Sequence, residues 1–209
     1  ADVIPRELSF IQTYLDTINE TAKIIYGGVA YNDTLPKQDH MLRWVYGRSR
    51  EMLTALERRK SPHNIISQNI CIRKKTFLEL NNNLSNRYGM DNLFSGQIKR
   101  QNIAVVHIDN PVIHLGLENN YIFLKKALQA VDTLILNERS KKIADDFTKL
   151  QKTAKNLKKY KLDGIYRLLT TPFVSTFKKN LLGQYPNLFF LDLYKLNYYL
   201  KKQRHYTNA

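Results

Sequence analysis

The chain changes its pattern near Gly116, and this change constrains the fold more than any other feature of the sequence. Before it, short runs rich in β-branched residues alternate with stretches whose apolar residues recur at helical spacing. After it, only helical spacing remains. Alternating strands and helices are typical of an α/β layer. We therefore expect an α/β domain over residues 1–119 and a helical C-terminal extension over residues 120–209.

The first part yields a specific series of elements. Pro5 suits the first turn of a helix, and Leu8, Ile11, Leu15 and Ile18 follow it at helical spacing. A β-rich run at 22–26 ends in two glycines, which predicts a strand closed by a tight turn. The remaining strands are expected at 65–72, 103–106 and 112–115, and the remaining helices at 37–59, 74–80 and 91–101.

The second part consists of amphipathic helices interrupted by proline. One helix is expected from Phe123 to beyond Val131, and a second one runs from Ile143 to Leu157 with strict 4-3-4-3 spacing of its apolar residues. Pro172 and Pro186 interrupt the pattern. The segment 188–200 is dense in Leu, Phe and Tyr.

The net charge is concentrated in this second part. The whole chain of 209 residues carries 33 Lys and Arg against 18 Asp and Glu, a formal net charge of +15. Residues 120–209 hold 18 of the basic residues and only 6 of the acidic ones. A positive field of this kind attracts phosphate, in nucleic acid or at an anionic bilayer, although a solvated lysine-rich surface would have the same composition.

Cys71 is the only cysteine, which excludes an internal disulfide and any metal site built from several thiolates. Together with the abundant Lys it favours a reducing, cytoplasmic setting. No apolar run approaches the roughly 20 residues that a membrane-spanning helix requires.

Few residues indicate chemistry without further information. Asp91 follows a Tyr-Gly turn at the start of an expected helix, where an acid either caps the helix or acts as a reactive carboxylate. His107 and His114 flank a short Asp-Asn-Pro turn. Each is either a core histidine or a metal ligand.

Several segments, in order, resemble family 2 glycosyltransferases of the GT-A fold. Residues 1–5, beginning Ala1-Asp2, resemble the end of the acidic Asp-x-Asp metal motif of that family. The segments 27–31, 42–48 and 67–74 resemble parts of its substrate cleft and neighbouring blocks. Residues 88–94 resemble the region of its Glu-Asp motif, and 107–116 resemble the block that closes the domain. The similarity covers about residues 1–119.

This resemblance implies a fold and a reaction. The implied fold is an incomplete GT-A-like, Rossmann-like mixed sheet with flanking helices, and the implied reaction transfers a sugar from a nucleotide-sugar donor to an acceptor hydroxyl with inversion. Asp91 corresponds to the catalytic base of the family. Asp2 and His114 correspond to metal ligands, which would hold Mg²⁺ or Mn²⁺ against the donor diphosphate.

The sequence departs from the family pattern in two places. It begins after the position of the first Asp of the metal motif, so the nucleotide-binding half of the family pattern is not represented. Met90 replaces the Glu that precedes the catalytic Asp in the family, which puts acceptor recognition in doubt.

The resemblance also assigns acceptor-side residues. We expect substrate contacts from Arg43, Trp44, Asn69 and Met90. Trp44 is either a core residue or a stacking platform for a sugar ring. Asn69 either hydrogen-bonds a sugar hydroxyl or satisfies backbone groups at the edge of a strand.

These expectations define a function and its partners. The enzyme would act in synthesis of a polysaccharide or surface glycan, on a glycan or lipid-linked acceptor, with its basic extension docked peripherally at the cytoplasmic face of the membrane. The alternative is a nucleic-acid- or membrane-binding module without catalysis. The tail aromatics fall mainly on apolar stripes, which argues against nucleic acid. The 4-3 seam of the extension would also suit a homo-oligomer.

Overall fold

The computed structural model describes residues 2–81 and 87–207, so Ala1 of the Asp-x-Asp-like segment lies outside the described residues. The chain forms a mixed α/β structure that divides into two compact units. The first unit comprises Ala1–Pro36, Trp44–Ser85 and Phe94–Leu117. The second comprises Lys37–Arg43, Asn86–Leu93 and Glu118–Ala209, so two short segments from the α/β part belong to the helical unit.

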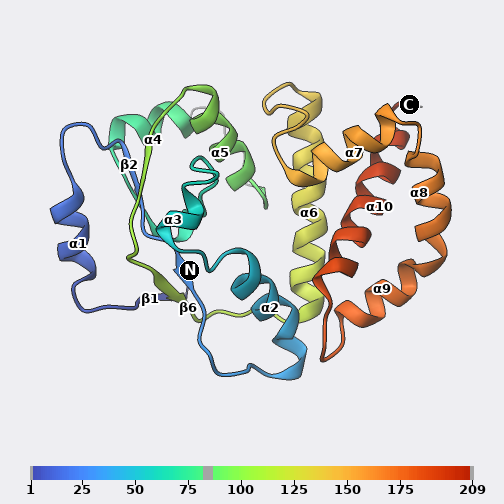
Figure 1. Cartoon of the computed structure of the whole chain (residues 1–209), viewed down its shortest axis with the longest axis horizontal. Helices are drawn as coiled ribbons and strands as arrows, with labels where there is room; N and C mark the ends of the chain where they lie inside the picture. The colour runs from blue at the N-terminus through green and yellow to red at the C-terminus, as the bar shows by residue number, and fades with distance from the viewer. Residues whose placement is uncertain (1, 82–86, 208–209) are drawn as a thin grey trace. The chain divides into compact units, whose positions relative to one another are not determined.

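Two small three-stranded mixed sheets form the centre of the first unit (Figure 1). In one sheet, β6 (Val112–His114) lies between β1 (Val3–Pro5), which is antiparallel to it, and β3 (Val29–Ala30), which is parallel. In the other, β2 (Ile24–Tyr26) lies between antiparallel β4 (Ile70–Ile72) and parallel β5 (Val105–His107). The strands predicted at 22–26, 103–106 and 112–115 are confirmed within one or two residues, whereas that at 65–72 is reduced to its last three residues.

The two sheets are linked by two short connections, and backbone hydrogen bonds join these connections to each other. β2 leads into β3 through Gly27 and Gly28, and β5 leads into β6 through residues 108–111. The amide of Asn110 donates to the Gly27 carbonyl at 3.2 Å, and that of Val112 to the Gly28 carbonyl at 3.3 Å. Gly28 has a φ of +87°, in the left-handed region that glycine adopts most readily. The predicted tight turn is not found, because the chain bends at Gly28 and continues from β2 of one sheet into β3 of the other.

Helices cover both faces of β2, as its alternating side chains require. Ile24 and Tyr26 pack against α4 (Lys74–Asn81) and against Phe94 and Ile98 of α5 (Asp91–Arg100). Ile25 points the other way and packs with Tyr14 of α1 (Phe10–Thr17). The helices expected at 74–80 and 91–101 are confirmed, and they form the core of this unit together with the strands.

The N-terminal prediction was wrong in one respect. Pro5 ends strand β1, opposite Val112, and does not open the helix, which begins only at Phe10. A proline lacks the amide hydrogen needed inside a sheet, but it is tolerated at the end of a strand. Of the apolar residues expected on one face, Ile11 and Leu15 lie in the helix and Leu8 and Ile18 lie just outside it, and all four are exposed.

The helix predicted over 37–59 is interrupted. The structure has a 3₁₀ turn η1 (Gln38–His40), helix α2 (Met41–Arg50) and a separate short helix α3 (Ala55–Arg58). Thr54 restarts the helical chain, because its hydroxyl accepts from the Glu57 amide while the Glu57 carboxylate accepts from the Thr54 amide at 2.8 Å. This capping box overrides the apolar periodicity that suggested one continuous helix.

The second unit is helical and is organised around its last helix. It contains α6 (Asn120–Arg139), α7 (Lys149–Lys159), α8 (Asp163–Thr170), a 3₁₀ turn η3 (Thr171–Phe173), α9 (Val174–Leu181) and α10 (Leu188–Thr207). Helix α10 contacts α6, α7, α8 and α9, and in Figure 1 it lies between α6 and α8. The prediction that the C-terminal part is largely helical is confirmed.

The core of this unit lies between α6 and α10. Val131, Leu134 and Ile135 of α6 pack with Leu196 and Tyr199 of α10. Ile143 and Phe147, predicted as part of a helix from Ile143 to Leu157, belong to the same core but precede α7. Thr148 explains the later start, because its hydroxyl accepts from the Gln151 amide and forms a capping box with the Gln151 side chain.

A buried polar network joins α6, α7 and α10. The Glu138 carboxylate accepts hydrogen bonds from the Tyr199 hydroxyl at 2.5 Å, from Gln151 Nε2 at 2.9 Å and from Gln203 Nε2 at 2.9 Å. Burial is the first cause that raises the pKa of the Tyr199 hydroxyl above its usual value, followed by the Glu138 carboxylate. The network fixes the register of three helices. Within residues 2–81 and 87–207, no helix has both the length and the apolar character needed to cross a bilayer.

Candidate functional site

The strongest candidate site lies where β1 and β6 pair. Val3 lies opposite His114, and the carbonyl of Asp2 accepts a hydrogen bond from the Leu115 amide at 2.8 Å. Asp2 and His114, separated by more than 110 positions in the sequence, are thereby brought to the same end of one sheet. Gly116 accommodates the Asp2 carboxylate, because a Cβ at this glycine would come within 2.7 Å of Asp2 Oδ2.

A buried tyrosine orients the His114 imidazole. Tyr31 Oη lies 3.4 Å from His114 Nδ1, and the two rings meet edge to face. The Tyr31 hydroxyl also donates a short hydrogen bond to Glu51 Oε2. Since its single hydrogen is directed to Glu51, the hydroxyl acts toward His114 as an acceptor, which places the imidazole hydrogen on Nδ1. In this tautomer Nε2 is the nitrogen that carries the lone pair.

The position of Tyr31 is itself fixed by a glycine. Gly47 of α2 packs on the Tyr31 ring so closely that a Cβ there would come within 2.1 Å of Tyr31 Cζ. The ring belongs to a cluster with Val29 and Val112, on the two strands that end beside the site. The orientation of His114 thus depends on buried packing as well as on the hydrogen bond.

Asp2 and His114 carry the types of donor atom that divalent cations bind. A carboxylate suits Mg²⁺ and Mn²⁺, and an imidazole nitrogen favours the transition metal of the two. In the part of the chain that the structure describes, no group of three or more His, Cys, Asp or Glu side chains could hold a metal ion. Asp2 and His114 would therefore supply two ligands at most. Mg²⁺ is commonly bound in this way, with substrate phosphates and water completing the shell.

Asp91 lies in the second unit and is the first residue of helix α5. Its side chain is exposed. The preceding turn is rigid: Gly89 has a φ of +87°, and a Cβ there would come within 2.7 Å of the Ala130 Cα on α6. The half-buried Met90 connects this turn to Asp91. A helix N-terminus stabilises negative charge, which favours a carboxylate at this position.

Arg43, expected to contact substrate, is buried in the second unit. Its guanidinium lies over the ring of Phe123, 5.3 Å from the centroid. Leu42 beside it is held by Asn120, whose Oδ1 accepts from the Leu42 amide at 2.7 Å. The guanidinium of Arg43 thus packs against an aromatic ring of α6, and this contact gives Arg43 a role in stabilising the fold.

Trp44 and Asn69 lie in the first unit. The Trp44 ring packs at the edge of the cluster around Val29, its Nε1 donates to the Asn32 carbonyl at 2.9 Å, and the Arg48 guanidinium covers it at 4.9 Å from the ring centroid. A sugar would have to displace Arg48 to stack on that face.

Asn69 corresponds to the structural alternative left open by the sequence. Its buried Nδ2 donates to the carbonyls of Gly28 at 2.6 Å and Asn110 at 2.8 Å, and its Oδ1 accepts from the Tyr14 hydroxyl at 2.7 Å. Both amide hydrogens are used to hold the connection between the two sheets. Burial is the main cause that raises the pKa of Tyr14 above its usual value.

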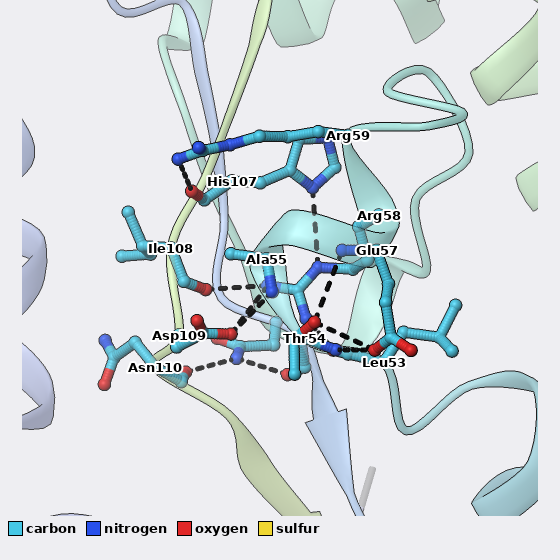
Figure 2. Close-up of polar contacts among 12 residues, drawn as sticks. Leu53, Thr54, Ala55, Glu57, Arg58, Arg59, His107, Ile108, Asp109 and Asn110 are labelled. Atoms are coloured by element: carbon cyan, nitrogen blue, oxygen red, sulfur yellow. Dashed lines mark hydrogen bonds and ion pairs between the residues drawn. The ribbon is translucent and has the colours of Figure 1, made fainter.

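A cluster around Arg58 was not anticipated from the sequence (Figure 2). The buried Arg58 guanidinium donates to the carbonyls of Leu53 and Ile108, the latter at 2.7 Å, and its Nε donates to His107 Nδ1 at 3.4 Å. Asp109 Oδ1 accepts from the Ala55 amide at 2.6 Å, at the start of α3. These bonds fasten α3 to the connection between β5 and β6, which leads to His114.

The Arg58 cluster explains why His107 is buried and why position 28 is a glycine. His107 Nε2 lies 2.9 Å from the Pro62 carbonyl and therefore carries the hydrogen, which leaves Nδ1 to accept from Arg58. His107 is thus a core histidine, and burial lowers its pKa. A Cβ at Gly28 would come within 2.3 Å of Arg58 Nη1. The Thr54–Glu57 capping box was the sequence signal that could have located α3 and, with it, Arg58.

The candidate residues thus fall into two sets. Asp2, His114, Trp44 and Asn69 belong to the first unit, and Arg43, Met90 and Asp91 belong to the second. Comparisons with known protein families, with curated proteins and with solved structures matched nothing to this chain.

Proposed function

We propose that this protein is an inverting glycosyltransferase that moves a sugar from a nucleotide-sugar donor to an acceptor hydroxyl. The observation that supports it most is the pairing of β1 with β6, which brings Asp2 to the strand that ends in His114. A carboxylate and an imidazole at one end of a sheet would supply two ligand types for a divalent cation that accompanies a diphosphate. The two sheets of the first unit would be part of a GT-A-like, Rossmann-like layer.

Each residue has a defined task in this mechanism. Asp2 and His114 would hold Mg²⁺ or Mn²⁺, and the bound ion would offset the negative charge that develops on the nucleoside diphosphate leaving group. Tyr31 and Glu51 hold the imidazole in the tautomer whose Nε2 carries the lone pair.

The exposed Asp91 would take the proton from the acceptor hydroxyl as its oxygen bonds to the anomeric carbon. The bond from that carbon to the diphosphate breaks on the opposite side, so the configuration inverts. The proton is transferred to the Asp91 carboxylate, and the electron pair of the broken bond leaves with the diphosphate.

Fewer residues are candidates for contact with the acceptor than the resemblance alone suggests. Arg43 and Asn69 are buried and have structural contacts, each within its own unit. Trp44 and Met90 are half-buried and remain the candidates for direct contact with a sugar. The acceptor would be a growing polysaccharide or a lipid-linked glycan.

The experiment is a donor panel assayed with the longest natural form of the protein. UDP-glucose, UDP-galactose, UDP-N-acetylglucosamine and a GDP-sugar are each incubated with Mn²⁺ or with EDTA, and release of nucleoside diphosphate is measured together with equilibrium binding of each donor. We expect metal-dependent release or binding for one donor. If no donor binds in the presence of Mn²⁺, the proposal fails.

A further inference from the structure

Helix α8 presents its apolar residues to solvent. Leu162, Ile165, Leu168 and Leu169 recur at spacings of three and four residues, and all of them are exposed. They define what we call the α8 face. In most surface helices such a stripe is turned toward the core.

The opposite side of α8 is the one that packs inward, and two hydrogen bonds join it to α10. The Tyr166 hydroxyl donates to the Leu193 carbonyl at 3.0 Å. The buried Thr170 hydroxyl accepts from Asn197 Nδ2 at 2.7 Å. These contacts fix the rotation of the helix, so the α8 face cannot turn inward without breaking them.

Aromatic residues extend the α8 face at both ends. Tyr160 precedes the helix, and Phe173 follows it in η3, and both side chains are exposed. Aromatic rings at the ends of an apolar stripe are typical of helices that lie in the interface between water and lipid. The exposed apolar side chains therefore form a run from residue 160 to residue 173.

The charges in the segment that carries the α8 face are almost all positive. Between residues 158 and 179 the sequence has six basic residues and a single acidic one, Asp163. Lys159, Lys161, Lys178 and Lys179 are exposed. An apolar stripe bordered by lysines is electrostatically complementary to a surface of negative charge.

A second exposed apolar stripe in the same chain provides a contrast. Leu8, Ile11, Leu15 and Ile18, on and beside α1, are also exposed. Residues 6–20, however, contain one basic residue and three acidic ones. The two stripes are similar in apolar character and opposite in the sign of the surrounding charge.

From these observations we infer that the α8 face docks on an anionic phospholipid bilayer, with the leucines entering the boundary between headgroups and acyl chains and the lysines contacting the headgroups. Burial of the apolar side chains and attraction of the basic residues act together in such docking. The inference concerns lipid binding and does not require the proposed sugar transfer, so either can fail alone.

The test compares two matched double variants of the full chain in vesicle co-sedimentation. Leu168→Ser with Leu169→Ser changes the α8 face, and Ile11→Ser with Leu15→Ser changes the α1 stripe. The exposed fractions of the four side chains are comparable, at 75 % and 64 % against 65 % and 57 %. Since all four are exposed, we expect both variants to fold, which circular dichroism would verify.

Vesicles of phosphatidylcholine alone and of phosphatidylcholine mixed with phosphatidylglycerol supply the two surfaces. We expect the unchanged protein to bind the mixed vesicles and not the neutral ones, with binding weakened by added salt. The α8 variant should bind on the order of tenfold more weakly or worse, because two leucines no longer enter the bilayer. The α1 variant should bind as the unchanged protein does.

Other occupants of the α8 face would be recognised by different results. Equal loss of binding in both variants, or equal binding to neutral and mixed vesicles, would overturn the inference. It would also be overturned if the unchanged protein failed to bind the mixed vesicles and instead dimerised in light scattering through a contact that the α8 variant abolishes. Unchanged vesicle binding by the α8 variant, with salt-sensitive binding to random DNA, would favour the nucleic-acid alternative.

Discussion

The rings of Tyr31 and His114 meet edge to face, with centroids 5.6 Å apart and an interplanar angle of 67°. The contact links the residue that follows β3 to the end of β6, where the proposed metal ligand lies. It makes the orientation of the imidazole dependent on a residue that does not itself touch a metal.

Removing the Tyr31 hydroxyl should weaken metal binding without removing a ligand. Tyr31→Phe keeps the ring on Gly47 but eliminates the bond to Glu51 and the acceptor for His114 Nδ1. We expect about tenfold weaker Mn²⁺ affinity in the presence of the nucleoside diphosphate, measured by calorimetry. Tyr166→Phe, which removes a tyrosine hydroxyl bonded to the Leu193 carbonyl in the second unit, is the matched control. Equal affinities in the two variants would refute the role of Tyr31.

Asp91→Asn should abolish transfer while leaving donor binding nearly unchanged. The amide keeps the size of the side chain but cannot take the proton, so we expect a loss on the order of a thousandfold in the rate of transfer. Asp163→Asn is a close control, because Asp163 is likewise the first residue of a helix. Initial rates with the donor identified by the panel decide the question. A rate for Asp91→Asn close to that of the control would exclude Asp91 as the base.

Gly89→Ala should destabilise the second unit. The new Cβ would lie 2.7 Å from the Ala130 Cα in a backbone conformation that alanine disfavours, so we expect a loss of about 1–3 kcal/mol in the free energy of unfolding. Gly164→Ala is the counterpart, since a Cβ at this helical position meets nothing within 4 Å. It should be neutral or stabilising by up to about 1 kcal/mol. Urea denaturation followed by circular dichroism compares the two variants.

Acid should destabilise the first unit partly through His107. Burial holds the pKa of folded His107 below its unfolded value of about 6.5, so below that pH the unfolded chain binds a proton that the folded chain excludes. Stability should therefore fall as the pH is lowered through about 6.5, by at most about 1.4 kcal/mol per pH unit from this group. The fluorescence of Trp44, the single tryptophan, reports unfolding of this unit.

Two variants distinguish the contributions of His63 and His107 to the pH dependence of stability. Burial also lowers the pKa of His63, so His63→Gln removes its contribution and leaves that of His107. In His107→Gln the dependence between pH 7 and 5 should be shallower than in the unchanged protein. If His107→Gln leaves the pH dependence of stability unaltered, protonation of His107 in the cluster of Figure 2 does not destabilise the folded protein, and the prediction is wrong.

The elements that were predicted well are those decided by local sequence. The helix α4 and the strand β5 follow from short-range periodicity and from β-branched residues. Helix α4 ends one residue later than predicted, and β5 begins two residues later and ends one residue later. The helix expected over 37–59 failed because a hydrogen bond between Thr54 and Glu57 outweighed an apolar pattern that continued across it. A helix cap depends on a few hydrogen-bonding atoms, and the spacing of apolar residues contains no information about them.

The candidate site was less accessible to sequence reasoning than the fold. That Asp2 lies beside the end of β6 depends on an antiparallel pairing across more than 100 residues, which only the family resemblance suggested. The burial of Arg43 on Phe123 and of Arg58 beneath Gly28 could not be foreseen, because arginine is ordinarily a surface residue. Pairing partners and buried charges are set by tertiary structure.

The central position of α10 has a consequence for the protein as it is being made. Helices α6, α7, α8 and α9 are all synthesised before the helix that they share as a packing partner. Until residues 188–207 have left the ribosome, the apolar side of α6 has no partner in α10, and the nascent chain exposes it to chaperones and to neighbouring chains. A premature stop codon before residue 188 would therefore remove far more than its length suggests, because four helices would lose the element around which they assemble.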